Sequence, residues 1–357
     1  LDPDTLRALP AAAPAGHPPL PHAGLAAALS DAADGGAESP LVLVTGDAGS
    51  GKKHALRVRR ARLRRAIGEG SATVSLANAL HMTKHGDLVA GSYRTLLAQA
   101  FGAELFEGSD LEAVNAWVSD KTRGRIPRIL DKLDPLSVAV ILNAIHFEAE
   151  WERPFEPRAT APGPFRLIGG ETVEVETMRQ TGMFRTVQMA GLSAITLPYE
   201  GGRLEMIVTL PADPDAAPVP PGAATFAELR AALEAAEPAR LDLTLPKVEI
   251  RFEAGLIEPF RAMGMTRPFV PGAADFGGVT GAGAGEDRIY ITQVQHKGFI
   301  SVAEDGTEAA AATGVEMSVT AAPPPAEAFR VDRPFAFAIL DKPTGAILFL
   351  GRVTDPR

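Results

Sequence analysis

One segment near the carboxyl end constrains the fold of this chain more than any other, because its pattern is that of a buried strand. In residues 304–322, EDGTEAAAATGVEMSVTAA, alternate side chains form one face that is entirely small or apolar: Thr307, Ala309, Ala311, Thr313, Val315, Met317 and Val319. Such period-two alternation predicts a strand half buried in a sheet. Ala and Gly are nevertheless poor strand formers, and three prolines at 323–325 close the segment. We therefore expect a loop in one state and a strand in another.

Composition narrows the class of protein and excludes several kinds of chemistry. The 357 residues are 46% hydrophobic and 22% charged, which suits one large soluble domain or two smaller ones. The net charge of −9 argues against nucleic-acid binding by the chain as a whole. The absence of cysteine excludes disulfides and thiolate catalysis.

The sequence shows no targeting or membrane signal. It has no run of 18 apolar residues, so no membrane contact is expected. The start, LDPDTLRALPAAAPAG, lacks the order of basic, apolar and small residues of a signal peptide. Because a chain that begins at Leu1 is consistent with trimming, extracellular and cytoplasmic locations both stay open.

Strand patterns dominate the chain after residue 71, and helices are interspersed without a βαβ rhythm. An almost continuous apolar run at 138–147, VAVILNAIHF, predicts a strand buried on both faces. Further strands are predicted at 72–80, 172–180, 193–199, 205–210, 241–245, 248–252, 289–302, 335–340 and 346–353. Helices are predicted at 91–101, 111–122, 225–234 and 254–263. This order favours an α+β fold with largely antiparallel sheets.

Several motifs in residues 71–357 resemble those of the serpin family, and they occur in the family's order. They are NAWV with KTRGRI (115–126), LNAIHFEAEWERPF (142–155), DLTLPKVEI (242–250), ADFGGVTG (274–281), QVQHKGFISVAEDGTEA (293–309) and RPFAFAILDKPTGAILFLGRV (333–353). The resemblance implies the serpin fold, with a main sheet that has five strands while the reactive loop is outside it. It also implies a monomer that inhibits a serine protease and needs no catalytic residues, metal or cofactor of its own.

In the mechanism that the resemblance implies, residues 304–325 form an exposed reactive loop that a protease attacks. The protease forms an acyl-enzyme through its own nucleophile, and the cleaved loop then enters the main sheet. The first residues to enter must be small, and the hinge meets this demand with Glu304, Gly306, Thr307, Glu308, Ala309, Ala310, Ala311 and Ala312. The alternative interpretation of the segment is a flexible linker.

The resemblance also assigns the bond that is cleaved. With Glu304 as the seventeenth residue before it, the reactive bond is Thr320–Ala321, to within one or two residues. A small β-branched residue at this position, after Val319, predicts an elastase-like or subtilisin-like target, because a trypsin-like protease requires Lys or Arg there.

Three further residues match family positions that control the opening of the sheet. Asn143 and His296 match a pair that forms a hydrogen bond beneath the main sheet, and Trp151 matches the tryptophan where the loop first enters. The alternative for each is ordinary core packing.

The first 70 residues depart from the family pattern. A Phe-Ser-Pro-x-Ser type motif, carried in serpins by a helix under the sheet, is missing. We assign residues 1–53 to an arm of low order and 54–357 to the serpin domain. The arm contains LVLVTGDAGSGKK (41–53), which approaches a phosphate-binding loop, but Lys53 replaces the hydroxyl residue that would bind magnesium. A glycine turn or a remnant of another gene remains the alternative to a nucleotide site.

An arginine-rich helix is predicted just before the first matching strand. It contains Arg57, Arg59, Arg60, Arg62, Arg64 and Arg65, and its place resembles the heparin-binding helix of some serpins. It is a candidate for weak polyanion binding that depends on salt, and the alternative is a solvated helical face.

The atypical start also leaves a second function open. If the amino-terminal helices are incomplete, the chain is a non-inhibitory serpin-fold protein that proteases cleave as a substrate. The small hinge residues favour inhibition. A nucleotide-dependent protein with a serpin-like tail is a third possibility, and it predicts nucleotide binding that Lys52→Ala abolishes.

Overall fold

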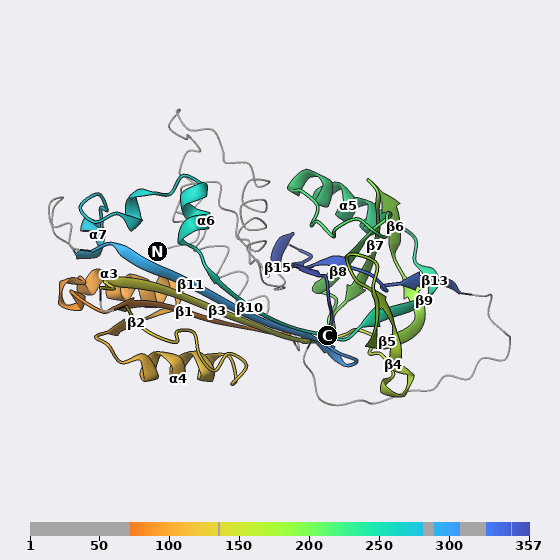
Figure 1. Ribbon diagram of the computed structural model, residues 1–357, viewed down its shortest axis with the longest axis horizontal. Coiled ribbons are helices and arrows are strands. Elements are labelled where there is room, and N and C mark those ends of the chain that lie inside the picture. The colour runs from red at the N-terminus through yellow and green to blue at the C-terminus, as the bar shows by residue number, and fades with distance from the viewer. Residues whose placement is uncertain (1–71, 135, 281–288, 308–325, 344) are drawn as a thin grey trace, which may run out of the picture.

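A computed structural model of the 357-residue chain describes residues 72–134, 136–280, 289–307, 326–343 and 345–357 (Figure 1). Its strands form three sheets, and the longest sheet extends away from the other two. The arm at 1–53, with its segment that approaches a phosphate-binding loop, and the predicted arginine-rich helix lie outside the described residues. So do most of the predicted reactive loop and the bond Thr320–Ala321.

The long sheet has five extended strands in the order β10-β11-β3-β1-β2. They span Val248–Gly255, Ile291–Val302, Ala139–Glu150, Thr73–Met82 and Ala103–Glu107, respectively. The central strand β3 pairs antiparallel with β1 and parallel with β11. The five extended strands agree with the prediction for a loop outside the sheet.

Strand β3 explains the continuous apolar run in the sequence. Its residues Ile145, Phe147 and Ala149 pack into one hydrophobic core, whereas Val140 and Leu142 pack into a second core on the opposite face. Because alternate side chains of a strand point to opposite faces, a strand between two cores must be apolar at nearly every position.

A short sixth strand, β12 (Gly306–Thr307), lies at one end of this sheet. It pairs antiparallel with β3, with Gly306 opposite Glu150 and Thr307 opposite Ala149. The first residues of the predicted loop are therefore already paired with the sheet, which the expectation of a loop wholly outside it did not include.

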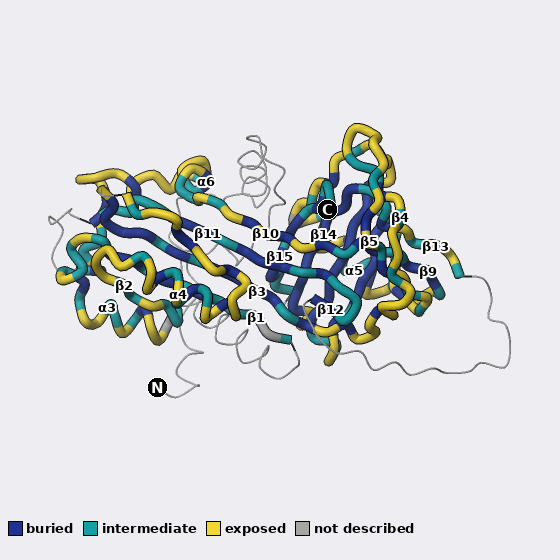
Figure 2. The backbone as a smooth tube through the Cα atoms, turned by 60° about the horizontal axis from the view of Figure 1, so that its bottom comes forward, coloured by how far each residue is buried: buried dark blue, intermediate teal, exposed yellow. Residues whose placement is uncertain are grey.

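The other two sheets complete the strand-rich part of the molecule. One has the order β13-β9-β5-β4 and the other β15-β14-β8-β7-β6. Their strands span Ala161–Arg166 (β4), Thr172–Phe184 (β5), Thr186–Met189 (β6), Leu192–Pro198 (β7), Leu204–Pro211 (β8), Ala239–Pro246 (β9), Glu327–Arg330 (β13), Phe335–Asp341 (β14) and Ala346–Val353 (β15). Figure 2 shows buried residues along β14 and β11, whereas the residues of the edge strands β4 and β13 are mostly exposed or half-buried. The sequence analysis did not predict β2, β4, β6 and β13.

The helices cover the edges and faces of the sheets. They are α3 (Gly91–Leu96, continued by a π-helical turn at Leu97–Phe101), α4 (Leu111–Lys121), α5 (Ala223–Ala235), α6 (Ile257–Ala262) and α7 (Gly277–Thr280), with 3-10 turns at Gly86–Leu88, Pro157–Ala159 and Arg267–Phe269. Helix α4 covers one face of the long sheet through buried Val114 and Val118. The helix predicted at 254–263 is wrong in its first part, because Ala254 and Gly255 continue β10.

Within the described residues, no helix is long and apolar enough to cross a membrane, and no cluster of three His, Cys, Asp or Glu side chains is placed to hold a metal.

Candidate functional site

The first described residues of the predicted loop wrap around the end of β3. The backbone N–H of Trp151 donates to the carbonyl of Asp305 (2.9 Å), and that of Phe155 donates to the carbonyl of Glu304 (2.8 Å). Together with the pairing of β12, these bonds attach residues 304–307 to the end of the long sheet. The described part of the predicted loop, residues 304–307, therefore has a fixed position at the sheet.

The side chains of Trp151 and Tyr199 also hold the backbone and side chains at the start of the predicted loop. The indole Nε1 of Trp151 donates to the carbonyl of Ala303 (3.0 Å), and the ring stacks on Tyr199 with centroids 4.5 Å apart. The Tyr199 hydroxyl bonds to Oγ1 of Thr307 (2.8 Å), and both side chains are fully buried. Burial raises the pKa of Tyr199, so its hydroxyl stays protonated. We call Trp151, Tyr199, Ala303 and Thr307 the loop anchor.

Glu304 fixes the base of the loop from a third side. Its carboxylate pairs with Nζ of Lys247 (2.9 Å) and accepts a hydrogen bond from Oγ1 of Thr160 (2.8 Å). Burial alone raises the pKa of Glu304, but the bonds from Lys247 and Thr160 outweigh burial and hold the pKa below its usual value. The predicted hinge residue is therefore a charged anchor for the loop.

Gly306 is required at its position by the closeness of β3. A Cβ atom placed on it would lie 2.1 Å from the carbonyl oxygen of Ala149. Because the obstruction is backbone, it cannot be relieved by a change of rotamer. Glycine is thus the residue that lets the loop approach the sheet this closely.

A second group of polar residues connects three strands in the middle of the long sheet. Nδ1 of His296 on β11 donates to Oδ1 of Asn143 on β3, at 2.6 Å. Nδ2 of Asn143 in turn donates to Oδ1 of Asn78 on β1, also at 2.6 Å. The structure shows the hydrogen bond between Asn143 and His296, which crosses the boundary between β3 and β11. Their control of sheet opening stays a prediction.

The same boundary is closed further along by Thr292. Its hydroxyl donates to the carbonyl of Ala139 (3.1 Å) and accepts from the backbone N–H of Val138 (3.2 Å). Pairing of β3 with β11 continues from this end as far as His146 opposite Phe299. Beyond that point, the facing position on β3 is taken by β12.

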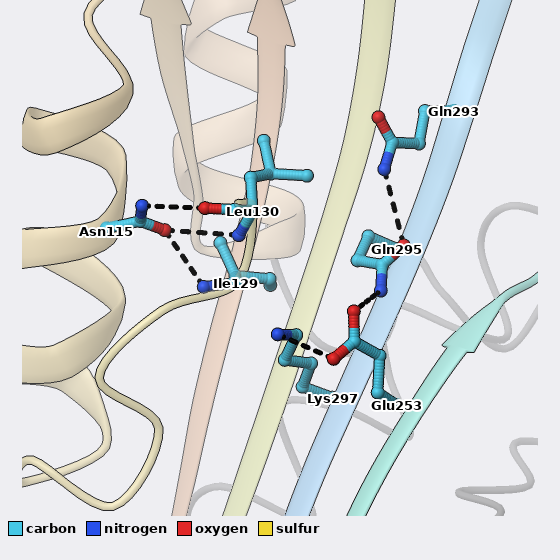
Figure 3. A network of polar contacts seen from close by, with 7 residues as sticks. All are labelled: Asn115, Ile129, Leu130, Glu253, Gln293, Gln295 and Lys297. Carbon is cyan, nitrogen blue, oxygen red and sulfur yellow. Dashed lines mark hydrogen bonds and ion pairs between the residues drawn. The ribbon is translucent and has the colours of Figure 1, made fainter. Parts of the chain in front are cut away.

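Figure 3 shows polar contacts that lie on either side of this boundary. On one side, Glu253 of β10 bonds to both Gln295 and Lys297 of β11, each at 2.7 Å, so β10 and β11 form one unit. On the other side, Asn115 of α4 accepts from the backbone N–H groups of Ile129 and Leu130 and donates to the Leu130 carbonyl. Asn115 of the NAWV motif therefore fixes the loop after α4.

His146 lies at the junction between the paired and the unpaired parts of the boundary. It is 1% exposed and packs against Phe299. Burial, followed by the charges of Arg125 and Arg123, lowers its pKa to about 4. His146 is therefore neutral at pH 7.

The structure brings together six of the predicted site residues in these two groups. Trp151, Glu304, Gly306 and Thr307 lie at the loop anchor or beside it, and Asn143 and His296 lie in the middle of the sheet. Glu308, Ala309, Ala310, Ala311 and Ala312 lie outside the described residues. The sequence analysis missed Tyr199, Asn78, Thr160 and Lys247.

Of these missed residues, only Lys247 could have been found from the sequence, because it lies within the motif DLTLPKVEI. The partners of the others are distant in sequence; Tyr199 and Thr307 are 108 positions apart.

A family model described as "Serpin (serine protease inhibitor)" matches residues 43–356. An uncharacterized serpin-like protein of Thermococcus kodakarensis is 39% identical over 259 residues, which are 71% of this chain and 58% of that protein. The leukocyte elastase inhibitor of Bos taurus is 35% identical over 301 residues, which are 80% of this chain and 78% of that protein. This chain therefore spans less than two thirds of the archaeal relative.

Two solved structures share the fold. Native protease nexin-1, solved with heparin, superimposes with a TM-score of 0.77 and 23% identity, over 94% of this chain and 97% of that one. The thermophilic serpin tengpin in its native state gives a TM-score of 0.73 and 24% identity, over 97% and 90% of the two chains. At these identities the likeness shows the fold alone.

Proposed function

The chain belongs to the serpin family, and from that premise we propose that it inhibits a serine protease by acting as a suicide substrate. Serpins are not enzymes, so the nucleophile and the general base belong to the protease. The observation that carries the proposal is the pairing of Gly306 and Thr307 with the end of β3. A loop that has begun to pair with β3 can extend this pairing as β11 separates from β3.

The register of β12 defines the strand that insertion would make. Each further loop residue meets the residue one position earlier on β3, because the pairing is antiparallel. Thr313 would then face Asn143, and Met317 would face Ala139, the first residue of β3. The inserted strand would be residues 306–317, equal in length to the 12 residues of β3.

The same register explains why the loop alternates. Residues directly opposite each other share a face of the sheet. Residues 309 and 311 would join Phe147 and Ile145 in the buried core, next to Thr307, which is already fully buried. Residues 312 and 314 are Ala and Gly, and they would face the side of the sheet that packs against α4.

Insertion would be driven by hydrogen bonds and by burial of the apolar face. Each new backbone bond contributes about 1 kcal/mol net, and apolar burial adds about 25 cal/mol per Å². The opposing step is separation of β3 from β11, which breaks the bond between Asn143 and His296 and displaces Thr292. Once the loop is cleaved, its free end no longer prevents this exchange.

We propose an elastase-like or subtilisin-like target that is cleaved at Thr320–Ala321. The small residues Val319 and Thr320 support this assignment, and a relative at 35% identity is named as a leukocyte elastase inhibitor.

The test is incubation with pancreatic elastase and with subtilisin, followed by a denaturing gel. We expect a covalent complex that survives denaturation. Thr307→Arg should yield cleavage without a complex, because Thr307 is already buried against Tyr199 and an unpaired charge at this position would exclude β12 from the sheet. Thr172→Arg, at an exposed position, is the matched control and should keep the complex. Clean cleavage of the unaltered protein near Thr320, with no complex, would instead support the non-inhibitory alternative.

A further inference from the structure

A cavity of about 260 Å³ lies beside the loop anchor, with Trp151 in its wall. The rest of the wall comes from Glu152 and Arg153, Gln180 of β5, residues 183–185, β7 at 196–198, Pro238, and the pair Glu205 and Lys342. Pockets for drug-sized ligands begin at about 300 Å³, so this cavity suits a compound of one or two rings.

Among the described residues, two of the three cations in the cavity wall lack carboxylate partners. Within the described part of the chain, neither Arg153 nor Arg185 forms an ion pair, and Arg185 donates only to the backbone carbonyls of Glu234 and Ala236. Lys342 lies 3.7 Å from Glu205, a buried carboxyl, so one anionic group of the wall is already partnered. Two guanidinium groups thus remain available for an anion, and Arg forms bidentate pairs with carboxylates.

Part of the remaining wall of the cavity is apolar, and Gln180 and Thr196 add polar groups. The side chains of Trp151, Phe184 and Leu197 line it and are buried. We propose that this cavity is a binding site for a small aromatic carboxylate, with the ring against Trp151 and Phe184 and the carboxylate toward Arg153.

Occupancy of the site would act on the loop anchor. Trp151 contacts the cavity and also holds the carbonyl of Ala303, while the backbone of Glu152 donates to the carbonyl of Pro198 (2.9 Å). The neighbouring Gln180 fixes the carbonyls of Arg153 and Pro154. Separation of β3 from β11 must move Trp151 relative to Ala303, so a ligand that holds Trp151 favours the closed sheet.

This coupling rests on the proposed function, whereas binding itself does not. Linkage requires that a ligand which favours the closed sheet binds it more tightly than the inserted form.

The binding test is calorimetry of the whole chain with 2-naphthoate, compared with 2-naphthylmethylamine, which has the same rings and the opposite charge. A Kd of about 0.1–1 mM is expected for a ligand of this size. Arg153→Gln should weaken naphthoate binding about fivefold or more, and Arg153→Lys should weaken it less. Arg158→Gln, at an exposed position away from the cavity, is the control and should bind as the unaltered protein. Equal affinity for the amine, or no loss with Arg153→Gln, would overturn the site.

The coupling test compares intact protein with protein cleaved in the reactive loop. We expect naphthoate to bind the cleaved form at least about fivefold more weakly. Equal affinity for both forms would overturn the coupling and leave the binding site standing. Naphthoate binding by a protein that forms no covalent complex with either protease would refute the proposed function and not the site.

Discussion

The two ends of the boundary between β3 and β11 differ in what β3 is bonded to. At one end, β3 pairs with β11, and the side chains of Thr292 and His296 reinforce that pairing. At the other end, β3 pairs with Gly306 and Thr307 of the loop, and its pairing with β11 has ended. Strand β3 therefore pairs with β11 over residues 139–146 and with the start of the loop at residues 149 and 150.

This difference indicates which end of the boundary opposes insertion of the loop. The loop end already has its glycine against the backbone of β3 and its first threonine buried, so little further adjustment is needed there. At the closed end, where β3 pairs with β11, the bond between Asn143 and His296 must break before the loop can insert further. Changes at the loop end should therefore alter whether insertion starts, and changes at the closed end should alter its rate and extent.

The largest effect on inhibition is expected from Gly306→Ala, which places a methyl group against the Ala149 carbonyl. The short strand β12 must then leave, and the buried hydroxyl of Tyr199 loses Thr307 as its partner, which costs about 1–3 kcal/mol. We expect the apparent free energy of unfolding to fall by that amount and most of the protein to be cleaved as a substrate. Gly91→Ala, where the added methyl has open space, is the control. Normal inhibition by Gly306→Ala would show that β12 has no part in insertion.

Acid should lower the free energy of unfolding by protonating His146, which lies where the pairing of β3 with β11 ends. Its pKa of about 4 in the folded protein lies below the ordinary 6.5, so the unfolded chain takes up the proton first as the pH falls. The stabilising contribution is complete above pH 6.5 and is lost between pH 6.5 and 4, by about 3 kcal/mol. Urea unfolding at pH 7 and 4 should show this loss, and His146→Gln should remove that part of the pH dependence. An unchanged pH dependence in His146→Gln would contradict the assignment.

The closed end can be weakened alone with His296→Ala. The loss of its bond to Asn143 should lower the stability of the intact form by about 1–3 kcal/mol. The cleaved form should be less affected, because Thr313 would then face Asn143. Thr313→Val gives the reverse test: it should lower the stability of cleaved protein by about 1 kcal/mol and leave intact protein unchanged. Equal effects on both forms would mean that the proposed register is wrong.

The smallest effect on stability is expected at the exposed ion pair between Lys247 and Glu304. Lys247→Gln removes the ion pair with Glu304, in which the Lys247 side chain is 39% exposed. Pairs of this kind contribute at most about 1 kcal/mol. The bond from Thr160 to Glu304 should retain most of the anchoring, so thermal unfolding should shift by no more than about 2 °C. A loss of inhibition would reveal a larger role for this pair.

The sequence was informative where a residue's environment is set by local pattern. The apolar run that became β3 predicted two-sided burial, and the alternation from Thr307 onward predicted a buried face whose first member is buried. The pairing of Asn143 with His296 came from the family resemblance. It could not come from pattern, because 153 positions separate the two residues.

The errors of the sequence analysis have the same cause, because local pattern does not show which distant strand a segment pairs with. Strand β4, APGPFR, contains two prolines, and it is tolerated because it lies at the edge of its sheet. Ala254 and Gly255 looked helical but continue β10 by pairing with His296 and Gln295. Alternation predicted that residues 304–322 suit a strand, yet it could not show that pairing begins at Gly306, because that depends on the backbone of β3.

The central claim is that the intact chain is held above its lowest free energy until the loop is cut. The direct measurement is thermal unfolding of intact protein and of protein cleaved near Thr320, with the cut confirmed by mass spectrometry. Insertion of a 12-residue strand should raise the midpoint by about 20 °C or more. Equal midpoints for the two forms would contradict the account.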